Sequence, residues 1–329
     1  MPAPTDSTRR ALLCALAALA ATGGMPAHAQ SAFRPVRPVR LISPLLAGGA
    51  TDAIVRPIAQ RLSELWGQPV VVENRPGGGT VIGTLAVVTA PPDGHTFGVV
   101  ISALTINPSL RSDLPYDTFA DVTPITQIGS VSSALVAHPS LPANDVKGLI
   151  ALAKASPGTI SWASLGVGTG GHITGELLRK KAGIDMVHVP FNGSSAAYRE
   201  ILPGRIPVGF VVLESALPHI KAGKLKLLAL TDRSRNQLHP QVPVVAETVP
   251  GVGFESVFGF IGPKGLPPEL AKAISADVAR VLAEPEVRKR LEEQAMTIAA
   301  TSPTEFGGVI RREVDYWRQA VRESGAHVN

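Results

Sequence analysis

Glycine-rich turns placed before helices carry the clearest chemical signal in this sequence of 329 residues. Glycines at such turns leave backbone N–H groups exposed, and the positive end of the helix dipole lies behind them, so the turns can bind anions. A single turn of this kind is equally well explained as a tight connection without a ligand. Four of them follow expected strands, at Ala47–Asp52, Gly77–Thr80, Gly166–Gly171 and Phe191–Ser195. Open α/β sheets bind ligands at the carboxyl ends of their strands, so the set predicts a carboxylate site.

Enzymatic motifs offer a competing interpretation. Gly166–Gly171 fits G-x-G-x-x-G, but a dinucleotide site also needs an acid at the end of the next strand, and Asp185 lies at its start. The sequence holds no G-x-S-x-G, H-E-x-x-H or phosphate-loop motif. On the expected helices no histidine is matched with a second histidine or an acid at metal-ligand spacing, and His188 is expected to pack on a strand. We therefore expect no catalytic residue, no metal and no cofactor.

Short apolar strands alternate with helical patterns along most of the chain, which favours parallel, doubly wound sheets. In the first helix Asp52 is expected to cap the N-terminus, with ligand contact as the alternative. Pro57 lies inside the same pattern and removes a backbone hydrogen bond, for which we have no functional explanation. The expected strands and helices that frame the turns are 39–43, 51–66, 69–73, 96–101, 159–164, 172–182, 186–189 and 194–202.

The rhythm of the elements predicts two α/β lobes joined by a hinge of crossing strands. Residues 30–132 and 254–329 would form the first lobe, and residues 133–253 the second. Segments 125–137 and 254–261 would cross between them. A chain that leaves a lobe and later returns to it is how hinged ligand clamps are built. At the C-terminus, an apolar stripe from Phe306 to Val321, which includes Trp317, is expected to be a packing face.

The N-terminal segment is typical of a secretory signal peptide. Arg9 and Arg10 precede the apolar run Ala11–Ala21, and Ala27-His28-Ala29 provides a small-residue cleavage site. We expect residues 1–29 to be removed near Ala29 and the protein to be periplasmic, by either the Sec or the twin-arginine route. A buried N-terminal helix is the alternative.

Composition narrows the class of protein further. Hydrophobic residues make up 45% of the chain and charged residues 17%, which is ordinary for a globular protein and excludes a disordered one. The single cysteine, Cys14, excludes an internal disulfide. The net charge of +5 comes without basic clusters interleaved with aromatic residues, so no nucleic-acid partner is expected.

Several ordered segments resemble the Bug/TctC family of periplasmic substrate-binding proteins, which serve tripartite tricarboxylate transporters. The similarity covers essentially all of residues 30–329. The segments that carry it are Gly48–Asp52, Gln68–Gly77, Ile106–Leu110, Leu114–Asp117, Met186–Phe191 and Ser215–Leu225.

This resemblance implies a type II-like, two-lobed periplasmic binding protein fold that closes on a small organic carboxylate. It also implies membrane transporter subunits as partners, and we expect a monomer. A sensor that feeds a signalling system is one alternative. A secreted enzyme on the same scaffold, with His172 or His188 as a base, is another. The ligand-binding residues that the resemblance and the turns imply are Gly48, Gly49, Thr51, Asp52, Ser102, Gly168, Thr169, Gly170, His172, Phe191, Asn192, Gly193 and Ser194.

Departures from the family pattern bear on the ligand. Val211 and Val212 stand where family members commonly have an Asp-Asn pair, and Glu214 stands where proline is usual. Fewer polar side chains would leave a ligand's amine or second carboxylate without partners. The sequence therefore predicts a ligand less polar than an amino acid, unless Glu214 compensates.

Overall fold

The structure is a computed structural model that describes residues 33–191 and 193–325. The expected signal peptide, Cys14 and the candidate ligand residue Asn192 lie outside the described residues. Among the described residues, no helix is both long enough and apolar enough to cross a membrane.

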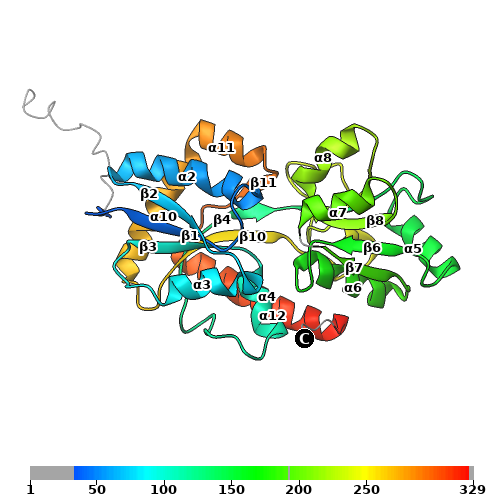
Figure 1. The fold of residues 1–329 in the computed structure, drawn as a ribbon, viewed down its shortest axis with the longest axis horizontal. Coiled ribbons are helices and arrows are strands. Elements are labelled where there is room, and N and C mark those ends of the chain that lie inside the picture. The colour runs from blue at the N-terminus through cyan, green and yellow to red at the C-terminus, as the bar shows by residue number, and fades with distance from the viewer. Residues whose placement is uncertain (1–32, 192, 326–329) are drawn as a thin grey trace, which may run out of the picture. The chain divides into compact units, whose positions relative to one another are not determined.

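The first of two mixed sheets combines parallel strands with the strands of the crossover (Figure 1). Its strand order is β11-β4-β10-β3-β1-β2. Strands β1, β2 and β3 are parallel, as the alternation of strands and helices predicted, whereas β10 is antiparallel to β3 and β4, and β11 is antiparallel to β4. The bounds are β1 Val39–Ser43, β2 Val70–Asn74, β3 Thr96–Val100, β4 Thr123–Val131, β10 Ser256–Gly262 and β11 Met296–Ile298.

The second sheet follows the same plan, with the order β7-β6-β8-β5-β9. Strands β6, β7 and β8 are parallel, and β5 is antiparallel to both β8 and β9. The prediction of α/β sheets is confirmed, but the sheets are mixed because β10 and β11 in the first sheet and β5 in the second run against the other strands. The bounds are β5 Ser133–Ala137, β6 Ser161–Ser164, β7 Val187–Pro190, β8 Val208–Val212 and β9 Lys226–Leu230.

Helices cover both faces of each sheet. One face of the first sheet packs against α2 (Ala50–Trp66), α10 (Pro268–Ala283) and α11 (Pro285–Glu292). The other packs against α3 (Val81–Val88) and α4 (Ala103–Leu110), and the 3₁₀ turn η1 (Gly78–Thr80) precedes α3. On the second sheet, α5 (Val146–Ala155), α6 (Gly170–Ala182) and the short α9 (Val245–Thr248) share one face. Helices α7 (Ser194–Ile201) and α8 (Leu213–Lys221) cover the opposite face.

The last helix, α12 (Pro303–Ser324), belongs to both cores. Phe306 and Ile310 in its first half pack with the first sheet, and Trp317 and Val321 in its second half pack with the second sheet. The predicted packing face is therefore confirmed, and it is shared between two cores. The predicted lobe boundaries remain a prediction.

Gly175 in α6 has no room for a side chain, because a Cβ there would lie 2.3 Å from the ring of Trp162. We expect Gly175→Ala to lower the free energy of unfolding by about 1–3 kcal/mol, since the ring must move in a packed core. Gly307→Ala in α12 is the matched control, because its Cβ would meet Pro124 at an ordinary 3.5 Å. The control should raise stability by about 0.5–1 kcal/mol. Urea unfolding measures both, and equal effects would contradict the packing argument.

Candidate ligand-binding loops

Strand registers place the predicted turns at one side of each sheet. Val100, the last residue of β3, pairs with Gly259, close to where β10 enters the first sheet from the crossover. Val212, the last residue of β8, pairs with Ser133, where β5 enters the second sheet. Because the parallel neighbours run the same way, the carboxyl ends of all six parallel strands lie on the crossover side of their sheets. The glycine-rich turns of both sheets are therefore directed toward the same crossover.

The first loop, between β1 and α2, is closed by the side chain of Asp52. Gly48 adopts a φ of +79° and donates its N–H to the Asp52 carboxylate at 2.9 Å. Asn74 and Arg56 donate to the same carboxylate at 3.0 and 2.9 Å. Although burial raises the pKa of Asp52, these hydrogen bonds lower it below the ordinary value. The carboxylate is 4% exposed and fully engaged, so it braces the loop.

The second loop, between β6 and α6, repeats this geometry with a histidine. Gly168 has a φ of +80° and donates its N–H to Nδ1 of His172 at 3.1 Å. Thr169 caps the helix, because its hydroxyl accepts the N–H of His172. His172 is 7% exposed, and burial lowers its pKa.

These closures decide which amides remain for a ligand. The N–H groups in the first turn of a helix have no intrahelical acceptor. Gly48 and Gly168 are engaged within their own loops. The donors that remain in the first loop are thus the amides of Gly49, Ala50 and Thr51. In the second loop they are those of Gly170 and Gly171, since the Thr169 N–H donates to the Gly166 carbonyl. Ala50 is exposed, whereas Thr51 and Gly170 are buried.

The remaining predicted residues fall into two groups. Ser102 is buried, and its hydroxyl accepts the Val257 N–H at 3.1 Å, so it is tied to β10. Phe191 and Gly193 lie beside the second loop, because their N–H groups donate to Ser164 and Leu165. Ser194 begins α7 next to them. The structure thus brings Phe191, Gly193 and Ser194 to the second loop.

A stack of aromatic rings supports the second loop from beneath. The rings of His172 and His188 lie 4.4 Å apart at an interplanar angle of 19°, and His188 stacks on Trp162 at 4.2 Å. Nε2 of His188 lies 2.7 Å from the hydroxyl of Ser164. Burial and the neighbouring His172 lower the pKa of His188 to about 4.

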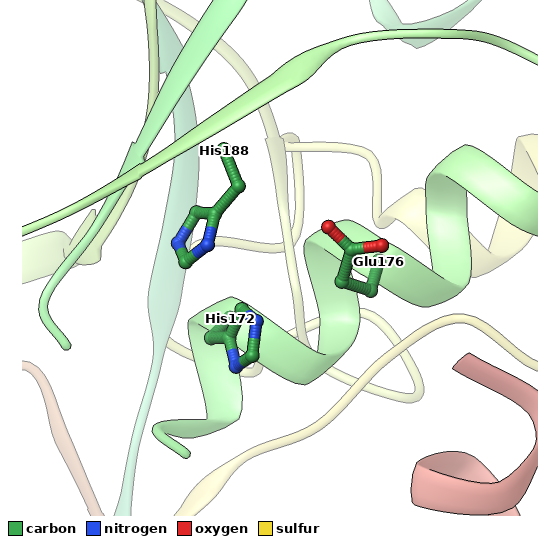
Figure 2. Close-up of side chains that lie close together, drawn as sticks. All are labelled: His172, Glu176 and His188. Atoms are coloured by element: carbon green, nitrogen blue, oxygen red, sulfur yellow. The ribbon is translucent and has the colours of Figure 1, made fainter. Parts of the chain in front are cut away.

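Figure 2 shows that Glu176 lies on α6 close to the two histidines. The ligand atoms of His172, Glu176 and His188 all lie within 4.8 Å of one another, which overturns the expectation that no histidine is matched with an acid. Sequence reasoning overlooked that Glu176 follows His172 by one helical turn. The hydrogen-bonding pattern nevertheless disfavours a metal. A neutral imidazole has one lone pair, and that of His172 accepts the Gly168 N–H. Glu176 is held by Arg179 at 3.0 and 3.1 Å.

Buried polar groups at the crossover were missing from the sequence predictions. Ser132, the single residue between β4 and β5, donates its hydroxyl to Asp232 at 2.6 Å. Asn236 donates to the same Asp232 oxygen at 3.0 Å, while the second carboxylate oxygen is buried with no hydrogen-bond partner. Burial, with a contribution from the charge of Glu255, raises the pKa of Asp232 to about 6. No sequence signal marked this network, because its members lie 100 residues apart.

Comparison with known proteins decides the family. The sequence model of a protein family, described as "Tripartite tricarboxylate transporter family receptor", matches residues 54–326. The chain belongs to this family. It is 32% identical to the protein BugT of Bordetella pertussis over 96% of this chain and 98% of that protein.

Two solved structures with bound ligands resemble this receptor. An R. palustris protein solved with adipate has 30% identity and a TM-score of 0.81 over 89% of this chain and 99% of the other. MatC from Rhodopseudomonas palustris with bound malate has 26% identity and a TM-score of 0.76 over 87% and 99%. Membership confirms the predicted family and fold class. It makes the chain a solute receptor, so the alternative of an enzyme with a histidine base is set aside.

Asp232→Asn tests the buried carboxylate at the crossover. A carboxyl whose folded pKa is raised from 3.8 to about 6 costs stability as pH rises through that interval. The variant should therefore gain about 1–3 kcal/mol over the wild type between pH 4 and pH 7.5. Urea unfolding at both pH values measures the difference. The exposed Asp315→Asn is the control and should show no such trend, and a parallel response of the two variants would contradict the argument.

Proposed function

We propose that this receptor binds a small organic carboxylate between the first loop and the second loop, for uptake by a tripartite tricarboxylate-type transporter. The observation that carries the proposal is the pair of helix N-termini, α2 and α6, on the crossover side of two separate sheets. Each keeps first-turn amides without an intrahelical acceptor. A carboxylate placed between them would complete both helices and meet the positive ends of both dipoles.

The crossover supports closure around such a ligand. Only Ser132 separates β4 from β5, and Glu255 with Phe254 leads into β10. These two short connections provide a hinge between the sheets, and because α12 packs in both cores, rotation must also shift α12 against one of them. A ligand that contacts both loops binds the closed form better and shifts the population toward it.

Adipate and malate in the two related structures support a carboxylate ligand. Val211 does not bear on the polarity of the ligand. It is 1% exposed and lies in the core beneath α7 and α8. Val212 packs against the core of the first sheet. The prediction of a less polar ligand therefore loses the support that these two positions gave it.

The signal peptide and the family support a periplasmic location for the chain after cleavage near Ala29. Described residues show no membrane-spanning helix. Membrane subunits of the transporter are the proposed partners, and the receptor is proposed to act as a monomer.

Ala50→Pro tests the site without disturbing the helix. Ala50 is the first residue of α2, where proline is well tolerated, and the extended backbone of Gly49 (ψ −178°) suits a residue before proline. The substitution removes one amide donor. We expect a carboxylate found by thermal-shift screening to lose about 10- to 100-fold in affinity by calorimetry, as for one charge-assisted hydrogen bond.

Ala50→Ser keeps the amide and is the control, which should bind as the wild type does. The screen covers dicarboxylates, tricarboxylates, amino acids and aromatic acids. A ligand at 100 times its dissociation constant adds about 2.7 kcal/mol of stability. Absence of any shift, together with no copurified acid by mass spectrometry, would overturn the carboxylate proposal.

A further inference from the structure

The first and second loops are each closed by a hydrogen bond from a glycine N–H to a side chain of the following helix. The two loops differ in which side chain accepts that bond. In each, a glycine with a positive φ donates its N–H to the side chain four residues later, at the third position of the helix. Asp52 accepts in the first loop and His172 in the second. A carboxylate accepts throughout the neutral pH range, whereas an imidazole accepts at Nδ1 only while that nitrogen is unprotonated.

The hydrogen bond from the Gly168 N–H therefore defines the tautomer and the protonation state of the His172 imidazole. Nδ1 carries the lone pair, so the single ring proton of the neutral form is on Nε2. A second proton on Nδ1 would place two N–H groups head to head across 3.1 Å. The loop cannot keep this geometry when His172 is a cation.

His188 braces the same loop by a second route. Its Nε2 lies 2.7 Å from the Ser164 hydroxyl, and that hydroxyl lies 3.3 Å from both the N–H and the carbonyl of Gly166. One histidine thus reaches Gly168 directly, and the other reaches Gly166 through a serine. His188 stacks on Trp162 and on His172, so the buried Trp162 ring helps to hold both histidines in place.

The surrounding groups favour neutral imidazoles. His188 from β7 faces His172, and two stacked cations would repel each other. Trp162 from β6 and Phe210 from β8 are apolar. Among the described residues, Glu176 on α6 is the charge that favours a cation on His172, but Arg179 pairs with it at 3.0 Å. Arg179 also lies 3.6 Å from Asp185.

We propose that His172 is a positioning residue whose neutral imidazole holds the Gly166–Gly170 loop in its ligand-binding form, so that acid weakens the binding of carboxylates by releasing this loop. The inference rests on the proposed function for its effect on ligand. The hydrogen bond that holds the loop lies entirely within this chain. The same two histidines then have a complete role that needs no metal.

Nuclear magnetic resonance of the ligand-free protein tests the loop directly. Long-range imidazole spectra should show His172 with Nδ1 unprotonated and Nε2 protonated at pH 8. The Gly168 amide signal should shift on acidification with the midpoint of His172. In His172→Asn this dependence should vanish, because the amide oxygen accepts without titrating. Asp52 shows that a side chain of that length reaches the equivalent glycine.

Binding gives the second readout, with adipate as the probe at pH 8, 7, 6 and 5. His172→Ala should weaken adipate about tenfold at pH 8, and His172→Asn should recover most of that loss. Wild-type affinity should fall toward pH 5 more steeply than that of His172→Asn. The control is His138→Asn, since Nδ1 of His138 also accepts a backbone N–H, from Ser140, but at the far end of β5. It should match the wild type.

The outcomes separate the two proposals. A protonated Nδ1, or a Gly168 signal that does not follow His172, overturns the loop inference even if carboxylates bind. If no carboxylate binds but the spectra behave as expected, the proposed function fails and the loop assignment stands. Zinc chloride titrated alone should give no binding. Tight zinc binding that is lost in both His172→Asn and His188→Asn would assign the cluster to a metal instead.

Discussion

Two antiparallel pairings, β10 with β3 and β5 with β8, determine where the glycine-rich loops of this receptor lie. Each joins a strand arriving from the crossover to a strand of the parallel group. Since β3 and β8 must therefore end near the crossover, every turn that follows a parallel strand ends there too. The position of the loops is thus a consequence of hydrogen-bond direction in the sheets.

Within each loop, a single buried acceptor converts a flexible glycine turn into a fixed one. Asp52 accepts the Gly48 amide and His172 accepts the Gly168 amide, so each loop is held by a side chain of its own helix. At the proposed site this arrangement reduces the ordering that a carboxylate would otherwise have to impose, which is how preorganisation increases affinity. The price is burial of a charge or an imidazole, and Asn74 with Arg56 in one loop and stacked rings in the other stabilise that burial.

Local signals made much of this predictable. Turn glycines, strand runs and the stripe on α12 depend on near neighbours in sequence, and they predicted the loops and the last helix. Contacts between residues that are far apart in the sequence could not be predicted from it. Ser132 and Asp232 meet only because β5 pairs with β9. The inward direction of Val211 depends on which face of β8 meets α7 and α8. Glu176 was visible at one helical turn from His172 and was overlooked.

Helix α12 has a consequence for how the molecule is made. Its 22 residues supply aromatic and aliphatic side chains to both cores, and they follow every strand of both sheets along the chain. The first sheet is also incomplete until β10 and β11 have been made, because these strands pair with strands far earlier in the chain. Neither core can therefore be completed before residues 303–324 have been synthesised, and contacts of such long sequence separation form slowly. Until then both cores stay incomplete, and an incompletely folded polypeptide is one that can be threaded across a membrane.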